Sequence, residues 1–348
     1  MGPRVILAEP RGFCAGVEMA IKALTWMVRV FEPPVYCYHE IVHNAAVVEA
    51  FSRAGVIFVD DVESVPEGSP VMLSAHGSSP EVVEEAGGRA AVMVDAVCPL
   101  VTKVHHEVKR MARDGYDIIY VGHAGHDEAV GTIAEAPDAV TLVDPVDGLH
   151  EFAADPDDRV ALVAQTTLGM YEWRGVLDEA RDRFPELWTA GKSDLCYATT
   201  NRQSAVRRLA GLVDLVLVVG SENSSNTQAL VRVASEAGVE ARRIDGPADI
   251  DPGWGEAFAT IGVTSGASAP DTTVEAVVAA LAPVGEPETL RTVAEDEYFP
   301  LPPTLRVFVR TLQALVEGAY ACRTPGHPGP MEEDRRWGAT EALELLGV

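Results

Sequence analysis

Three cysteines spread along the chain stand in look-alike contexts, and thiolates in this arrangement are suited to hold a metal centre. They are Cys14 in EPRGFCAG, Cys98 in DAVCPLVT and Cys196 in SDLCYATT. Cys14 and Cys98 follow short apolar runs and open helix-like stretches, and Cys196 stands just before one. Separations of 84 and 98 residues are too wide for a local zinc finger. The pattern favours one iron–sulfur cluster with three protein ligands in place of four, which leaves one iron open to substrate.

The place of each cysteine near a helix start supports this interpretation. Free backbone N–H groups and the helix dipole stabilise a thiolate there. A lone cysteine is more often an ordinary buried residue, and we assign Cys37 and Cys322 in that way. Because Cys14, Cys98 and Cys196 stand in matching contexts, we interpret these three as metal ligands and not as ordinary buried residues.

Three of the nine histidines end apolar runs and are candidates to bind an anion. They are His43 in YHEIVHN, His76 in LSAHGSS and His126 in VGHAGHDE. An imidazole donates a hydrogen bond to a phosphate oxygen without the bulk of Lys or Arg. Each lies at the end of a predicted strand or in the loop after it. The remaining histidines, among them His327 in the tail, are assigned structural or incidental roles.

Two loops rich in hydroxyl and amide groups complete the predicted anion site. Ser224, Ser225 and Asn226 lie in GSENSSNTQ, and TSGASAP supplies Ser265 and Ser268. Such residues are more often helix N-caps than ligands, but a helix start with adjacent hydroxyls is also a site for anions. No GxxxxGK[ST] or GxGxxG motif is present, which weakens a nucleotide-binding interpretation.

Glu128, two residues after His126, is the candidate proton donor. We place it on a loop, where a carboxyl group donates a proton if its surroundings keep it protonated. The sequence supports equally well a solvated loop carboxylate with no role. Thr166 and Thr167 in AQTTLG stand at a strand end as candidate hydroxyl relays.

Short β-branched runs alternate with amphipathic stretches along the chain, which predicts parallel sheets covered by helices. Ligands bind at the carboxyl ends of strands in such sheets. The predicted organisation is an α/β unit at 15–97, a second at 98–194, a third at 195–283 joined by the strand within 1–14, a closing segment at 284–306, and a helical C-terminal extension at 307–348.

The bulk composition limits the partners. The chain has 348 residues, of which 47% are hydrophobic, and a formal charge of −26. This charge repels nucleic acid and anionic membranes, so we expect neither as a partner. Five widely spaced cysteines do not form a secreted disulfide framework, and the N-terminal apolar run is too short for a signal peptide. We therefore expect a cytoplasmic protein.

Ordered motifs across residues 4–306 resemble one family. PRGFCAGV, HEIVHN, SAHG, CPLVTKVH, GHDEAVGT, QTTL, DLCYATTNRQ, VVGSENSSN and GASAPD occur in the order seen in hydroxymethylbutenyl diphosphate reductases. These enzymes perform the terminal step of the methylerythritol phosphate route to isoprenoids. The resemblance implies three α/β units arranged as a pseudo-threefold trefoil around a central [4Fe–4S] cluster.

The resemblance also implies roles for the residues already singled out. Cys14, Cys98 and Cys196 would bind the cluster, and Glu128 would donate the proton. Thr166 would contact the substrate near its hydroxyl group. The diphosphate would be held by His43, His76, His126, Ser224, Ser225, Asn226 and Ser268. Electrons would come from an external donor such as ferredoxin or flavodoxin.

Other interpretations stay open at this point. A hydro-lyase with an open-iron cluster, acting on another small phosphorylated substrate, would use the same ligands. A zinc hydrolase would use the same cysteines and histidines. An iron–sulfur redox sensor is the non-catalytic alternative, although no basic stripe indicates nucleic-acid binding, and the tail after Arg306 has no assigned role.

Overall fold

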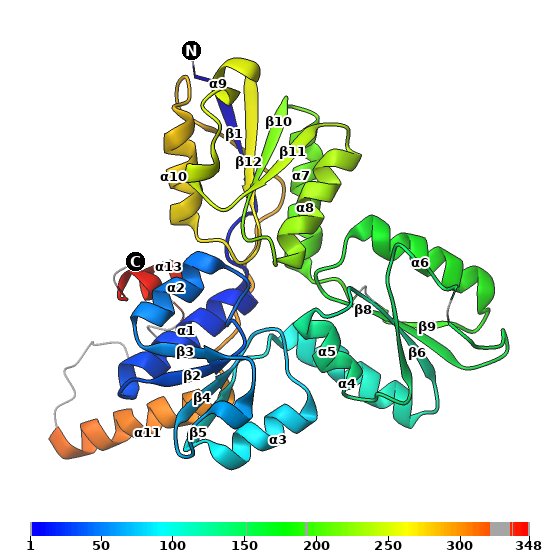
Figure 1. The fold of residues 1–348 in the computed structure, drawn as a ribbon, viewed down its shortest axis with the longest axis vertical. Coiled ribbons are helices and arrows are strands. Elements are labelled where there is room, and N and C mark those ends of the chain that lie inside the picture. The colour runs from blue at the N-terminus through cyan, green and yellow to red at the C-terminus, as the bar shows by residue number, and fades with distance from the viewer. Residues whose placement is uncertain (1, 151, 192–193, 321–334, 336, 347–348) are drawn as a thin grey trace. The chain divides into compact units, whose positions relative to one another are not determined.

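The described residues of the protein form three separate parallel β-sheets (Figure 1). The structure is a computed structural model that describes residues 2–150, 152–191, 194–320, 335 and 337–346. Cys322 and His327 lie outside this part of the chain. Met1–Cys14 and Leu100–Asp296 form one compact unit, here called the larger unit. Ala15–Pro99 and Glu297–Val348 form the other, called the smaller unit.

The smaller unit is built on a four-stranded sheet of order β3-β2-β4-β5. Its strands are β2 (Val35–Tyr38), β3 (Val56–Val59), β4 (Pro70–Leu73) and β5 (Val92–Asp95). Its helices are α1 (Ala15–Val30), α2 (Ala45–Arg53), α3 (Pro80–Arg89), α11 (Pro303–Tyr320) and α13 (Ala339–Glu344). Trp26 of α1 packs edge-on against Trp337, with 6.3 Å between ring centroids. The last described segment of the chain is therefore part of this unit's core packing.

The larger unit holds two sheets. One has the order β7-β6-β8-β9, from β6 (Asp117–Val121), β7 (Val140–Val143), β8 (Val160–Ala164) and β9 (Trp188–Thr189), with α4 (Pro99–Arg113), α5 (Asp127–Ile133) and α6 (Met170–Arg183). The other has the order β11-β10-β12-β1-β13, from β1 (Arg4–Glu9), β10 (Leu215–Val219), β11 (Glu240–Ile244), β12 (Thr260–Ser265) and β13 (Glu288–Arg291). Its helices are α7 (Tyr197–Ala210), α8 (Ser225–Glu236), α9 (Trp254–Ala257) and α10 (Asp271–Leu281).

Continuous apolar runs explain the central strands. All five residues of β8 and all five of β10 are buried, as expected for strands with helices on both faces of a parallel sheet. Every strand pair is parallel. The predicted class, three parallel-sheet α/β units, is therefore confirmed. Strand β1 pairs with β12 and β13, while the exact limits of the three predicted units stay a prediction.

Within the described part of the chain, no helix has both the length and the apolar character that crossing a bilayer requires.

Candidate functional site

The same local arrangement recurs at the three predicted cluster ligands. Cys14, Cys98 and Cys196 each directly precede a helix, namely α1, α4 and α7. The backbone N–H of each donates to a carbonyl in the loop after a neighbouring strand: Cys14 to Ala267 at 3.2 Å, Cys98 to Ala75 at 3.0 Å and Cys196 to Thr166 at 3.0 Å. Each contact joins a cysteine loop to a loop that carries a predicted substrate residue.

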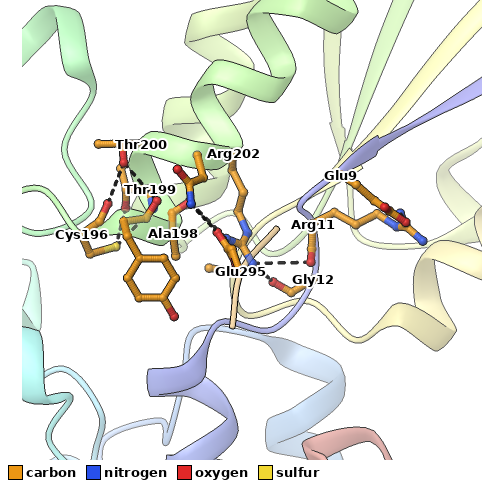
Figure 2. Close-up of polar contacts among 12 residues, drawn as sticks. Glu9, Arg11, Gly12, Cys196, Ala198, Thr199, Thr200, Arg202 and Glu295 are labelled. Carbon is orange, nitrogen blue, oxygen red and sulfur yellow. Dashed lines mark hydrogen bonds and ion pairs between the residues drawn. The ribbon is translucent and has the colours of Figure 1, made fainter. Parts of the chain in front are cut away.

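Cys196 combines a backbone donor suited to a thiolate with burial that disfavours the thiolate in the absence of a metal. It is the N-cap of α7, and its Sγ accepts a hydrogen bond from the Thr199 backbone N–H at 3.2 Å. The Thr199 hydroxyl lies 3.0 Å from the same sulfur (Figure 2). Burial, followed by the charge of Cys14, raises the pKa of Cys196 to about 11. The backbone donor is thus ready for a thiolate that a metal ion would stabilise.

The Cys14 loop is shaped by a glycine. Gly12 has a φ of +69°, and a Cβ there would lie 2.7 Å from a carboxylate oxygen of Asp271. The Gly12 N–H donates to Ser265 Oγ at 2.8 Å. A larger residue would therefore displace the loop that leads to Cys14.

The donor set fits an iron–sulfur cluster. Among the described residues, Cys14, Cys98 and Cys196 form no disulfide and are partly exposed, whereas Cys37 is fully buried on β2. Burial raises the pKa of the Cys37 thiol well above its usual range. Three accessible thiols at helix starts can be ligands, and Cys37 matches its assignment as a core residue.

Glu128 is not on a loop, as the sequence suggested, but in the first turn of α5. Its side chain is buried, with a relative exposure of 2%. The Thr166 N–H donates to Oε1 at 2.6 Å, and the Thr166 hydroxyl donates to Oε2 at 3.0 Å. Desolvation raises the pKa of Glu128 to about 7, although the Thr166 contacts oppose this and Asp194 adds to it. Burial excludes the solvated-carboxylate alternative, and the carboxyl is poised for proton transfer near neutral pH.

His126 caps α5, and this contact defines the tautomer. Its Nδ1 accepts a hydrogen bond from the Glu128 backbone N–H at 3.2 Å. Because Nδ1 accepts, the ring proton of neutral His126 is on Nε2. The residue therefore presents an N–H donor away from the helix that holds Glu128.

Gln165 organises a cluster of hydroxyl groups that the sequence did not reveal. Its Oε1 accepts from the His123 N–H at 3.0 Å, which fixes the orientation of the amide. Its Nε2 donates to Thr167 Oγ1 at 2.8 Å and to Ser225 Oγ at 3.1 Å. Thr167 Oγ1 also donates to Ser225 Oγ at 3.1 Å. Since Ser225 accepts twice, its own hydroxyl hydrogen is directed elsewhere.

The neighbouring residues of α8 combine capping with contacts to the cysteine loops. Ser224 is the N-cap and accepts from Thr227 N, as the more common explanation for such serines predicts. Asn226 Oδ1 accepts from Ala267 N at 2.9 Å, and its Nδ2 donates to Thr199 Oγ1 at 3.4 Å. Asn226 thus lies between the loop that contacts Cys14 and the first turn after Cys196. Ser268 follows in the same loop and is buried.

In the smaller unit, His43 and His76 come from the loops after the paired strands β2 and β4. Their rings stack with 3.9 Å between centroids and an interplanar angle of 13°. His43 Nδ1 lies 3.2 Å from Glu40 Oε2, and His76 Nδ1 lies 3.4 Å from Ser74 Oγ. Each imidazole carries a ring N–H, so the pair is a source of N–H donors.

Each unit thus brings together part of the predicted set. Cys98, His43 and His76 follow strands of the smaller unit. The other candidates follow strands of the larger unit: Cys14, His126, Glu128, Thr166, Cys196, Ser224, Ser225, Asn226 and Ser268. Every candidate comes from the carboxyl end of a parallel strand or the helix start that follows it, where such sheets bind ligands.

The fold defines a class, a parallel α/β protein, and the predicted cluster cysteines and anion-binding residues lie at its strand ends. The chain belongs to the LytB protein family, whose profile matches residues 5–282. A 4-hydroxy-3-methylbut-2-enyl diphosphate reductase 1 from Mycobacterium bovis is 47% identical over 306 residues, covering 87% of this chain and 91% of the relative. A reductase of the same name from Acidothermus cellulolyticus is 47% identical over 327 residues, covering 93% and 95%.

A solved structure agrees with these relatives. The E-1-hydroxy-2-methyl-but-2-enyl-4-diphosphate reductase from Plasmodium falciparum is 33% identical, with a TM-score of 0.86, and the match covers 90% of this chain and 100% of that one. The family predicted from the motifs is confirmed, and with it the prediction that the chain is an oxidoreductase.

Proposed function

We propose that this chain converts 4-hydroxy-3-methylbut-2-enyl diphosphate into isopentenyl diphosphate and dimethylallyl diphosphate. The proposed cofactor is a [4Fe–4S] cluster held by Cys14, Cys98 and Cys196. The single observation that carries the proposal is the repeated backbone contact between each cysteine and a loop with a substrate candidate. The names of the relatives supply the substrate.

The reaction breaks one carbon–oxygen bond. Two electrons and two protons enter, and the allylic hydroxyl leaves as water. The allyl fragment gains a single hydrogen at one terminus or the other, which gives the two products. When bound, the cluster supplies the electrons and, at an iron without a protein ligand, a Lewis acid for the hydroxyl oxygen. The three helix starts hold the thiolates for this group through their N–H groups and dipoles.

Glu128 and Thr166 deliver the proton to the leaving oxygen. With a pKa raised to about 7 by desolvation, Glu128 keeps a substantial protonated fraction at neutral pH. In that form Oε2–H donates to Thr166 Oγ1, which reverses the contact of the ionised form and turns the Thr166 hydroxyl hydrogen outward. The Thr166 N–H to Oε1 then stabilises the carboxylate that remains after transfer.

Neutral donors hold the diphosphate. Gln165 and Thr167 direct the Ser225 hydroxyl hydrogen outward, and Ser224, Asn226 and Ser268 lie in the adjoining loops. His126 adds its Nε2–H, and His43 and His76 supply the smaller unit's donors. A net charge of −26 makes local donors necessary for an anionic substrate. Such positioning of the carbon skeleton is a large part of the expected rate effect.

The electrons come from an external carrier, for which we propose a ferredoxin or flavodoxin, and we propose a cytoplasmic location. Anaerobic purification followed by absorbance, iron counting and reductant titration tests the proposal. Product formation that needs both the cluster and added reductant supports it. Turnover of the allylic diphosphate without reductant would point to a hydro-lyase, and a colourless zinc protein would exclude the reductase.

A further inference from the structure

Arg202 is a buried charge close to two predicted cluster ligands. It lies on α7, and its side chain has a relative exposure of 0%. Nη1 donates to Glu295 Oε1 at 3.0 Å and Oε2 at 3.2 Å, and to Ala198 O at 3.1 Å. Nη2 donates to Gly12 O at 2.8 Å. Figure 2 shows the guanidinium between the turn that begins at Cys196 and the loop through Gly12.

These contacts connect three segments that are distant in the sequence. Gly12 is two residues before Cys14, and Ala198 is two residues after Cys196. Glu295 belongs to the segment after β13, and its Oε1 also accepts from Asn201 Nδ2 at 3.0 Å. One guanidinium therefore fixes the distance between two cysteine loops and holds the closing segment beside them.

Stability alone is a poor explanation for this arrangement. A buried ion pair often contributes little net stability because both charges lose their hydration. Arg202 Nε, moreover, has no hydrogen-bond partner within the described chain, which adds a cost. The planar guanidinium is, however, well suited to hold several carbonyl and carboxylate oxygens in fixed geometry.

We propose that Arg202, oriented by Glu295, is a positioning residue that sets the spacing of Cys14 and Cys196 for one cluster and favours the cluster's reduced state. The inference rests on the proposed function, since it assumes that these thiols share an iron–sulfur group. Positive charge in a poorly hydrated site stabilises added negative charge, and Arg202 contacts the carbonyls of Gly12 and Ala198, each two residues from a predicted cluster ligand. Glu295 balances that charge from the side of the closing segment.

Three variants separate the effect of the Arg202 charge from the effect of its hydrogen-bond geometry. Arg202→Gln removes the charge and most of the contacts. Arg202→Lys keeps the charge but loses the planar fork, and Glu295→Gln keeps Arg202 while removing its counter-charge. The control is Glu288→Gln, because Glu288 pairs with Arg4 at 2.6 Å on the exposed surface of the same unit.

The measurements are the cluster's midpoint potential and the rate of iron loss to a chelator, on anaerobically reconstituted full-length protein. We expect Arg202→Gln to lower the potential, Arg202→Lys to leave it near wild type and Glu295→Gln to raise it. We expect both Arg202 variants to lose iron about tenfold faster, and Glu288→Gln to match wild type in both measurements.

The pattern distinguishes the proposal from a purely structural role, which would speed iron loss without ordering the potentials by charge. Midpoint potentials that do not follow the charge of the variants, or Arg202 variants that lose iron no faster than Glu288→Gln, would overturn the inference. The proposed function would still stand, provided that the wild-type protein assembles the cluster. A wild-type chain that assembles no iron–sulfur cluster would overturn both. If Arg202→Gln does not fold, Glu295→Gln and Arg202→Lys still give the comparison.

Discussion

Gln165 and Thr166 follow β8 as neighbours in the chain, yet they organise two polar clusters of different character. Thr166 contacts the buried carboxyl of Glu128 through its N–H and its hydroxyl. Gln165 contacts the hydroxyls of Thr167 and Ser225. The first cluster contains a group that titrates near neutral pH, and the second contains none.

The difference indicates that the two clusters at the end of β8 have separate roles, proton transfer and anion binding. In the Glu128 cluster, the hydrogen bond to Thr166 reverses when the carboxyl gains a proton, so this cluster is suited to move protons. In the Gln165 cluster, the His123 N–H donates to Oε1 and so fixes the orientation of the amide. Nε2 must then donate to Thr167 and Ser225. That cluster is suited to bind an anion in a constant geometry. Changes in the first should act on kcat, and changes in the second on KM.

The largest expected effect is that of Glu128→Gln. The amide retains the size of the side chain but cannot supply a proton, so we expect kcat to fall about 10²- to 10⁴-fold with KM little changed. Steady-state kinetics of the reconstituted enzyme check this. Glu172→Gln, at a carboxyl paired with Arg232 in the same unit, is the control and should keep wild-type kcat. Normal turnover by Glu128→Gln would remove this residue from the mechanism.

The pH dependence of kcat tests the same cluster. Because desolvation raises the pKa of Glu128 to about 7, the acid form is lost as the pH rises through that value. We expect kcat to fall about tenfold per unit at higher pH, and the residual rate of Glu128→Gln to lack this limb. A wild-type rate that stays flat from pH 6 to 9 would contradict the assignment.

A smaller effect, on KM, is expected for Gln165→Glu. The carboxylate accepts hydrogen bonds from Thr167 and Ser225, which turns the Ser225 hydrogen inward and adds negative charge beside the diphosphate. We expect KM to rise about 10- to 100-fold while kcat changes much less. Equal losses in kcat and KM, or none in KM, would show that the two clusters do not act separately.

The smallest effect concerns stability of the cluster-free protein. Glu128 has a folded-state pKa above its unfolded value of 4.5, so its stabilising contribution is complete below pH 4.5 and is lost as the pH rises through 7. Linkage gives a difference of about 3 kcal/mol. Urea unfolding from pH 5 to 8 should therefore show a steeper decline for wild type than for Glu128→Gln, and parallel curves would argue against the raised pKa.

The sequence predicted the central strands because they leave local signals, and it named the site candidates on local motifs, whose roles stay predictions. Runs such as VALVA and LVLVV mark strands buried on both faces. The strands β9, β11 and β13 were missed, since each lies at the edge of its sheet and lacks such a run. An edge strand is specified by its neighbour more than by its own residues.

Two features of the site needed coordinates. The sequence suggested a loop position for Glu128. A histidine is not among the usual N-cap residues, yet His126 fills that position here. Gln165 stands in the QTTL motif, but the motif gave it no role. Its orientation comes from the His123 N–H, which is 42 residues away in the chain, and such a contact leaves no local pattern.

The account depends most on which thiols bind iron. Iron anomalous diffraction from anaerobically grown crystals of the reconstituted protein measures this directly. We predict one cluster with iron at bonding distance from the sulfurs of Cys14, Cys98 and Cys196, and one iron without a protein ligand. Iron bound to Cys37, or to fewer than all three of the predicted cysteines, would contradict the account.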